Sequence, residues 1–166
     1  CSILLYLPFM HDGKMPIGSL GTYLSQWRFN APFFRWLEPL FGIPVIVVAS
    51  LCVGLVAAEF SRRTMRRDDP CAWAWPIAVT IFLMPAIYPW YLVWLTPFLT
   101  VAGTFPLTIW TVTSISTYAG WESESAGKCW NLPMWVEVFE YSCVAASLGL
   151  GYWFRRASTK VVREGY

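Results

Sequence analysis

Aromatic and polar side chains gather in one short segment near the beginning of the chain. They include Tyr23, Trp27, Arg28 and Asn30. Aromatic rings combined with amide and guanidinium donors can hold sugar hydroxyls, and the planar fork of Arg28 suits a lipid phosphate. An interfacial aromatic anchor, with Arg28 reaching toward lipid headgroups, explains the same residues. Residue types alone favour the anchor and leave the binding site open.

A second segment, residues 83–98, interleaves three prolines with aromatic side chains that include Tyr88, Trp90 and Tyr91. Each proline removes a backbone donor and bends or stops a helix. In a bilayer, a broken helix is tolerated where it is buried in protein or lines a wet cavity. The segment therefore predicts a shaped site at the outer end of a membrane span, and an aromatic belt at a tight turn explains it equally well.

Several acidic side chains are candidates for a catalytic base on the same side of the membrane: Asp12, Glu38, Glu122, Glu124, Glu137 and Glu140. We expect them to be solvated surface acids, with Glu137 and Glu140 sharing one helix face at the membrane rim because they are three residues apart. The single histidine and the absence of a C-x-x-C pair give no metal-ligand spacing. We therefore expect no metal and no cofactor.

The composition indicates an integral membrane protein of the all-α class. Of 166 residues, 57% are hydrophobic, 18% are aromatic and 13% are charged, against about 25% charged in an ordinary globular domain. Aromatic rings with a polar edge favour membrane–water interfaces. The basic residues form no long exposed patch, which argues against nucleic-acid binding.

Apolar stretches long enough to approach the bilayer thickness predict a polytopic bundle of about five transmembrane helices. The spans are expected near residues 40–59, 71–88, 90–103, 105–119 and 136–154. Residues 1–9 are interpreted as the remaining part of an N-terminal helix. Residues 10–38 are expected to form an outer loop with an interfacial amphipathic helix. The whole of 1–166 is treated as one membrane domain and as a fragment of a longer protein.

Basic loops orient the predicted spans. Residues 61–67 and 155–163 hold the arginine clusters, which should be cytoplasmic. Both clusters lie on one side only if residues 90–118 cross the membrane twice, so we favour two passes over a single kinked helix. One half of that stretch is short enough to be re-entrant. The acidic loop 121–128 then faces outward.

Two motifs resemble a known family. The motif Tyr23-x-x-x-Trp27-x-Phe29-Asn30, followed by a span and an arginine-rich inner loop, precedes the stretch from Pro85 to Phe98. Together they look like the GT-C polytopic glycosyltransferases, and most like a mannosyltransferase-like branch related to glycosyltransferase family 87. The resemblance covers roughly residues 1–120. Residues 121–166 match only as a generic terminal helix.

The resemblance implies an extracytoplasmic active site within many membrane helices. The donor would be a polyprenyl-phosphate sugar, often mannose, and the acceptor a lipid-linked glycan or envelope glycolipid. The acidic base would lie upstream of Cys1, and Tyr88 stands where the family commonly has histidine. The implied donor-binding residues are Tyr23, Trp27, Arg28, Asn30, Tyr88, Trp90 and Tyr91. Besides membrane lipids, no further partner is implied.

Two other functions fit a polytopic chain. A transporter or flippase component would use broken or charged helices near the middle of the membrane. The predicted spans lack such charges, and the prolines fall near an outer end, which argues against transport. A non-catalytic assembly subunit is the third alternative. Consumption of a radiolabelled polyprenyl-phosphate sugar separates the first function from the other two.

Overall fold

The structure is a computed structural model that describes residues 23, 26–120 and 132–164, with side chains described up to residue 153. The described residues are mostly helical and contain no β-strand, which confirms the all-α prediction. One isolated parallel bridge joins Phe29 to Ala86. The N-terminal helix remnant at 1–9, most of the outer loop and the acidic loop 121–128 lie outside the described residues.

The helices follow one another with short connections. Their bounds are α2 Pro32–Phe41, α3 Ile43–Thr64, α4 Pro70–Phe82, α5 Pro89–Leu92, η2 Val93–Phe98, η3 Ala102–Thr104, α6 Phe105–Thr113, η4 Ser114–Gly120 and α8 Met134–Glu164. The labels η mark 3₁₀ helices.

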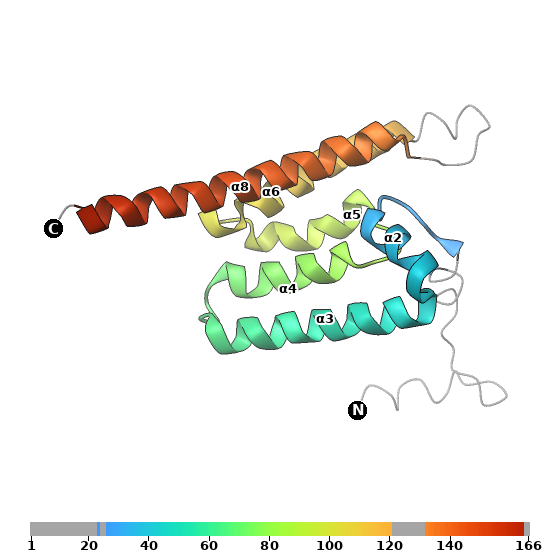
Figure 1. The fold of residues 1–166 in the computed structure, drawn as a ribbon, viewed down its shortest axis with the longest axis horizontal. Helices are drawn as coiled ribbons and strands as arrows, with labels where there is room; N and C mark the ends of the chain where they lie inside the picture. Colours follow the sequence, from blue (N-terminus) through green and yellow to red (C-terminus); the bar gives the residue numbers. More distant parts are fainter. Residues whose placement is uncertain (1–22, 24–25, 121–131, 165–166) are drawn as a thin grey trace.

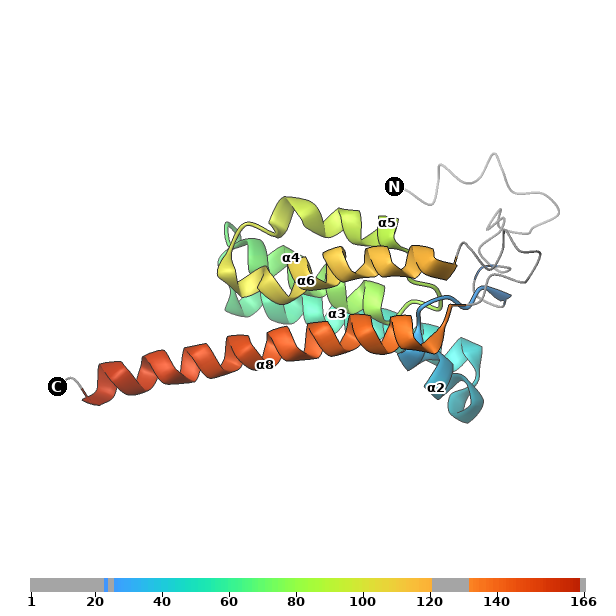
Figure 2. The same cartoon turned by 90° about the horizontal axis from the view of Figure 1, so that it is seen from above.

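Two antiparallel helix pairs form the bundle, as Figures 1 and 2 show. The first pair is α3 with α4, and the second is α6 with α8. Between them α5 and η2 run in one direction, and the chain then reverses before α6. The α3–α4 connection and the C-terminal end of α8 consequently lie at the same end of the bundle, whereas α2 lies at the other.

Local sequence explains where α2, α3 and α4 begin. Gly42 adopts φ 74° between α2 and α3, a left-handed conformation that favours glycine and interrupts the helix. Asp69 caps α4, because its Oδ1 accepts a 2.8 Å hydrogen bond from the backbone N–H of Cys71. Pro70 follows at the first helical position, where its missing N–H costs nothing.

The two helices of the first pair approach closely at Gly54. A Cβ atom at this position would lie 2.8 Å from Thr80 Oγ1, well inside van der Waals contact. Ser50 Oγ adds a 3.3 Å hydrogen bond to the carbonyl oxygen of Leu83. The glycine therefore lets α3 and α4 pack near each other while leaving a space between their side chains elsewhere.

The helices differ in length from the predicted spans. Among the described residues, α3 is the single helix long and apolar enough to cross a membrane. The predicted span 40–59 begins too early, because Leu40 belongs to α2, and α3 continues to Thr64. Three of the other stretches form shorter pieces: 71–88 ends as a helix at Phe82, 90–103 divides into α5, η2 and the beginning of η3, and 105–119 into α6 and η4. The predicted span 136–154 lies within the longer helix α8. Prolines account for several of these breaks.

Candidate functional site

The outer-loop motif and the proline–aromatic segment lie side by side. The backbone N–H of Ile87 donates to the carbonyl oxygen of Phe29 at 2.8 Å, and that of Phe29 donates to Pro85 at 3.4 Å. The hydroxyl of Tyr23 also donates to the carbonyl oxygen of Ala86 at 3.1 Å. Because the prolines keep this segment out of a helix, its carbonyl oxygens are free to accept these bonds. Two motifs about sixty residues apart therefore form one site.

Tyr88 is the centre of the aromatic cluster that results. Its ring stacks on Phe29 at a centroid distance of 4.6 Å and on Trp90 at 4.5 Å. Trp27 and Tyr91 meet the same ring edge-on at 6.1 Å and 5.7 Å. Stacked and edge-to-face pairs both suit the quadrupole of an aromatic ring. Tyr88 is thus held rigidly among four neighbours.

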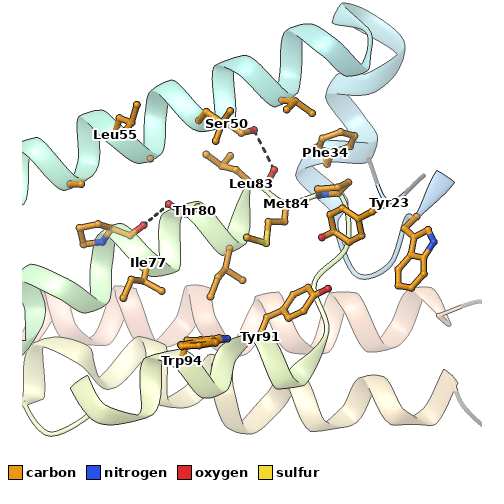
Figure 3. Close-up of a pocket in the computed structure, with 18 residues that line it drawn as sticks. Tyr23, Phe34, Ser50, Leu55, Ile77, Thr80, Leu83, Met84, Tyr91 and Trp94 are labelled. Atoms are coloured by element: carbon orange, nitrogen blue, oxygen red, sulfur yellow. Dashed lines mark hydrogen bonds between the residues drawn. The ribbon is translucent and has the colours of Figure 1, made fainter. Parts of the chain in front are cut away.

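A cavity of about 1170 Å³ runs between α3 and α4 beside this cluster (Figure 3). Tyr23 and Phe34 lie at one end and Leu55 and Ile77 at the other. The residues that line it are Tyr23, Trp27, Phe34, Val47, Ser50, Leu51, Gly54, Leu55, Ala58, Pro76, Ile77, Thr80, Ile81, Leu83, Met84, Pro85, Tyr91 and Trp94. No acidic or basic side chain occurs among these described residues.

The hydroxyls along the walls of the cavity are occupied by the protein itself. Ser50 donates to Leu83, and Thr80 Oγ1 donates to the carbonyl oxygen of Pro76 at 2.8 Å (Figure 3). Burial, reinforced by the neighbouring Tyr91, raises the pKa of Tyr23 well above its usual range. Tyr23 therefore remains a neutral hydroxyl at every physiological pH. The cavity is apolar along its length and carries tyrosine and tryptophan side chains at one end.

Arg28 does not face this cavity. Its Nε and Nη2 donate to the two carboxylate oxygens of Glu38 at 2.7 and 2.9 Å, and its guanidinium lies 4.8 Å from the ring of Phe34. Hydrogen bonds from Arg28 hold the pKa of Glu38 below its usual value. A phosphate that binds Arg28 must therefore compete with a bidentate carboxylate.

Asn30 points away from the cavity into a buried polar network. Its Nδ2 donates to Glu140 Oε2 at 2.9 Å, and Trp110 Nε1 donates to Glu140 Oε1 at 2.7 Å. The hydroxyl of Tyr141 donates to the carbonyl oxygen of Asn30 at 2.8 Å. Asn30 has φ 48°, a left-handed conformation that asparagine tolerates better than most residues. The network ties the outer loop to α6 and α8.

The expectation that Glu137 and Glu140 are solvated surface acids is wrong. Glu140 is fully buried and Glu137 is 8% exposed. Both lie on the face of α8 that packs toward the protein, where Glu137 pairs with Arg35 of α2. The missed signal was the position of two acids within an apolar stretch, since carboxylates in such a setting are usually paired.

Six of the seven residues implied as donor ligands fall into two places in the structure. The aromatic ones, Tyr23, Trp27, Tyr88, Trp90 and Tyr91, come together in the cluster, and Asn30 serves the buried network. The described residues define a helical bundle with one helix long and apolar enough to cross a membrane and an apolar cavity with aromatic rings at one end. Searches of protein-family models, curated protein sequences and solved structures found no match for this chain.

Proposed function

We propose that this chain is the C-terminal part of a polytopic membrane glycosyltransferase. It would move a sugar, most often mannose, from a polyprenyl-phosphate donor to a lipid-linked or envelope glycan on the extracytoplasmic side. The bundle would be GT-C-like, with the basic loops 61–67 and 155–163 in the cytoplasm. The single observation that carries the proposal is the long apolar cavity that ends at the cluster of tyrosine and tryptophan rings.

Exposed apolar surface supports a membrane location. Only 11% of the most apolar part of α3 is buried, so α3 differs from the core helix of a soluble protein. Val48, Val56 and Phe60 on this helix, which do not line the cavity, are between 60% and 68% exposed. Soluble monomers rarely expose so large a continuous apolar face. Lipid, or further spans of the same protein, would cover it.

Hydroxyl groups in α6 and η4 support the same location. Thr111 and Thr113 donate to the carbonyl oxygens four residues before them, both at 2.8 Å. Ser114, Ser116 and Thr117 donate three residues back, at 2.7 to 2.8 Å. A helix that satisfies its hydroxyls internally can face hydrocarbon without unpaired polar groups.

The direction of the helices supports the proposed orientation. The arginines of 61–67 lie at the α3–α4 end of the bundle, and the C-terminal end of α8, which carries 155–163, lies at that same end (Figure 1). The reversal between η2 and α6 produces this arrangement. Two basic clusters on one side are the usual mark of the cytoplasmic face.

The shape and chemistry of the cavity favour an amphiphile with a long apolar tail. Val47 and Ala58 of α3 both line the cavity, and eleven residues of helix correspond to roughly 16 Å. Burying a hydrocarbon tail along this length would favour binding by about 25 cal/mol for each Å² of apolar surface removed from water. The aromatic end would hold the sugar and phosphate, since aromatic side chains such as Tyr23 and Tyr91 combine ring faces with hydroxyl groups.

In the proposed reaction the acceptor hydroxyl oxygen attacks the anomeric carbon of the donor sugar. The bond from that carbon to the phosphate oxygen breaks, and polyprenyl phosphate leaves with the electron pair. An acidic residue of the complete protein would take the hydroxyl proton. The Tyr91 hydroxyl can donate to the leaving phosphate, and the Tyr23 hydroxyl can do so only by leaving the Ala86 carbonyl oxygen. Arg28 joins them only if the phosphate displaces Glu38.

Replacing Tyr91 with alanine should lower sugar transfer at least about tenfold, since it removes a wall of the aromatic end and a hydroxyl donor. The measurement is transfer of radiolabelled mannose from polyprenyl-phosphate mannose by the complete protein in membranes. Trp153→Ala, at an exposed position on α8, is the control and should leave transfer unchanged. Wild-type protein that leaves the donor unconsumed with every envelope acceptor supplied would contradict the enzyme proposal and favour a transporter or assembly subunit.

Replacing Ala58 with tryptophan should shorten the cavity at the end away from Tyr23. We expect the variant to lose transfer from long-chain donors several-fold while retaining transfer from donors with a tail of only two isoprene units. The comparison of the two donors in one preparation controls for folding. An equal loss with both donors would show that the tail does not occupy this cavity.

A further inference from the structure

The charged residues of α2 form ion pairs with other parts of the protein. Arg35 pairs with Glu137 at the beginning of α8, and Glu38 accepts two hydrogen bonds from Arg28 of the outer loop. Positions 35 and 38 are three residues apart, so they share one face of the helix. The first ion pair joins residues 102 positions apart in the sequence, and the second joins α2 to the chain just before it.

The opposite face of α2 carries large apolar side chains. Phe33, Trp36 and Leu40 follow the spacing of a single helix face. Trp36 is 75% exposed, Leu40 is 72% exposed, and Phe41 beside it is 58% exposed. An ordinary surface helix places its apolar face on the core and its charges in water. In α2 the core-facing Phe34 is 1% exposed, and the outward face is apolar as well.

A second, outward apolar face indicates an apolar medium outside α2. Exposing these side chains to water would forfeit roughly 25 cal/mol for every Å² of apolar surface. The ion pairs with Glu137 and Arg28 offset the charges of Arg35 and Glu38, and the half-exposed Arg35 can reach the headgroup level. The outward face also continues into that of α3, since Val45 and Val48 are 56% and 60% exposed.

The turn at Gly42 sets the orientation of α2. Its left-handed φ of 74° separates α2 from α3, and Figures 1 and 2 show α2 lying across the end of the bundle rather than along it. Tryptophan is enriched at the level of lipid headgroups. Trp135, at the beginning of α8 beside the partner of Arg35, is 62% exposed and would extend the same belt.

We infer that α2 is an interfacial helix whose Phe33, Trp36, Leu40 and Phe41 are immersed in the lipid–water boundary, at the end of the bundle that holds the aromatic cluster. The inference rests on the proposed membrane location. It assigns the interfacial helix, which the sequence predicted within the outer loop 10–38, to residues 32–41. The two ion pairs would keep the aromatic end of the cavity level with the bilayer surface.

The test measures the accessibility of nitroxide labels in the complete protein, reconstituted in vesicles of phosphatidylcholine and phosphatidylglycerol. Native cysteines are replaced by serine, and single labels are placed at Trp36→Cys and Leu40→Cys. Val48→Cys on α3 is the lipid reference, and Arg66→Cys in the α3–α4 connection is the aqueous reference. Collision with oxygen reports lipid, and collision with a water-soluble nickel chelate reports water.

We expect the labels at 36 and 40 to collide with oxygen several-fold more often than with the nickel chelate, as at 48 and opposite to 66. If 48 lies in lipid while 36 and 40 resemble 66, or exclude both reagents under a protein partner, the inference is wrong and the membrane location stands. If 48 also resembles 66, the membrane location is itself wrong.

A second measurement avoids the cysteine-free background. Brominated phospholipids quench tryptophan fluorescence on contact, and Trp36→Phe removes one ring while keeping the apolar surface. The fraction of tryptophan fluorescence that brominated lipid quenches should be smaller in this variant than in wild type. If the quenched fraction and the melting temperature are both the same as in wild type, Trp36 lies outside the lipid.

Discussion

Glu140→Ala should be among the most destabilising single substitutions in the chain. It leaves the amide of Asn30 and the indole N–H of Trp110 without an acceptor, at about 1–3 kcal/mol for each buried donor. Thermal unfolding in detergent micelles should show a large drop in melting temperature. Phe139→Ala, one residue away on α8 and 48% exposed, should show little change.

Two further variants distinguish the loss of the hydrogen-bond network from the loss of side-chain volume. Glu140→Gln should cost less than alanine, because Asn30 can turn its amide so that Oδ1, which has no partner among the described residues, accepts from the new amide. Asn30→Gly keeps the left-handed backbone and removes the side chain. A double-mutant cycle with Glu140→Ala should show coupling of about 1 kcal/mol or more. Additive effects would mean that the two residues act independently.

Gly54→Ala should also destabilise the protein, by about 1–3 kcal/mol. The new methyl group would lie 2.8 Å from Thr80 Oγ1. That oxygen cannot move away easily, because it is bonded to Pro76 and threonine is stiff at χ1. The α3–α4 pair must separate or shift, which the midpoint of thermal unfolding would report.

A matched control exists on α8. A Cβ at Gly149 meets nothing within 4 Å, so Gly149→Ala should stabilise its helix by up to about 1 kcal/mol. Combining Gly54→Ala with Thr80→Ala should restore much of the lost stability, since the clash disappears. If Gly54→Ala and Gly149→Ala behave alike, the close approach of α3 and α4 is not what Gly54 provides.

The residues of the proposed site can be recognised from the sequence, but their contact cannot. The sequence indicates the aromatic residues at 23, 27, 88, 90 and 91 as two groups, because prolines and rings at close spacing are visible in any window of sequence. Backbone hydrogen bonds between Phe29 and residues 85–87 bring the two groups into contact. No local pattern encodes a contact between segments sixty residues apart.

Arg28 and Asn30 show the reverse case. Both carry groups suited to a ligand, yet in the structure Arg28 binds Glu38 and Asn30 binds Glu140. The residue type shows which hydrogen bonds a side chain can donate. The neighbouring residues in the folded protein determine which acceptor it binds. The same reasoning failed for Glu137 and Glu140, whose burial depends on which face of α8 meets the bundle.

The sequence by itself determined the helical class and the apolar stretch of α3, since these follow from composition and hydrophobic runs. The tertiary structure decided the bounds of the helices, the antiparallel pairing, the cavity between α3 and α4 and the ion pairs of α2. The physical reason is that backbone preference acts within a few residues, whereas a cavity or a buried carboxylate exists only where distant segments meet.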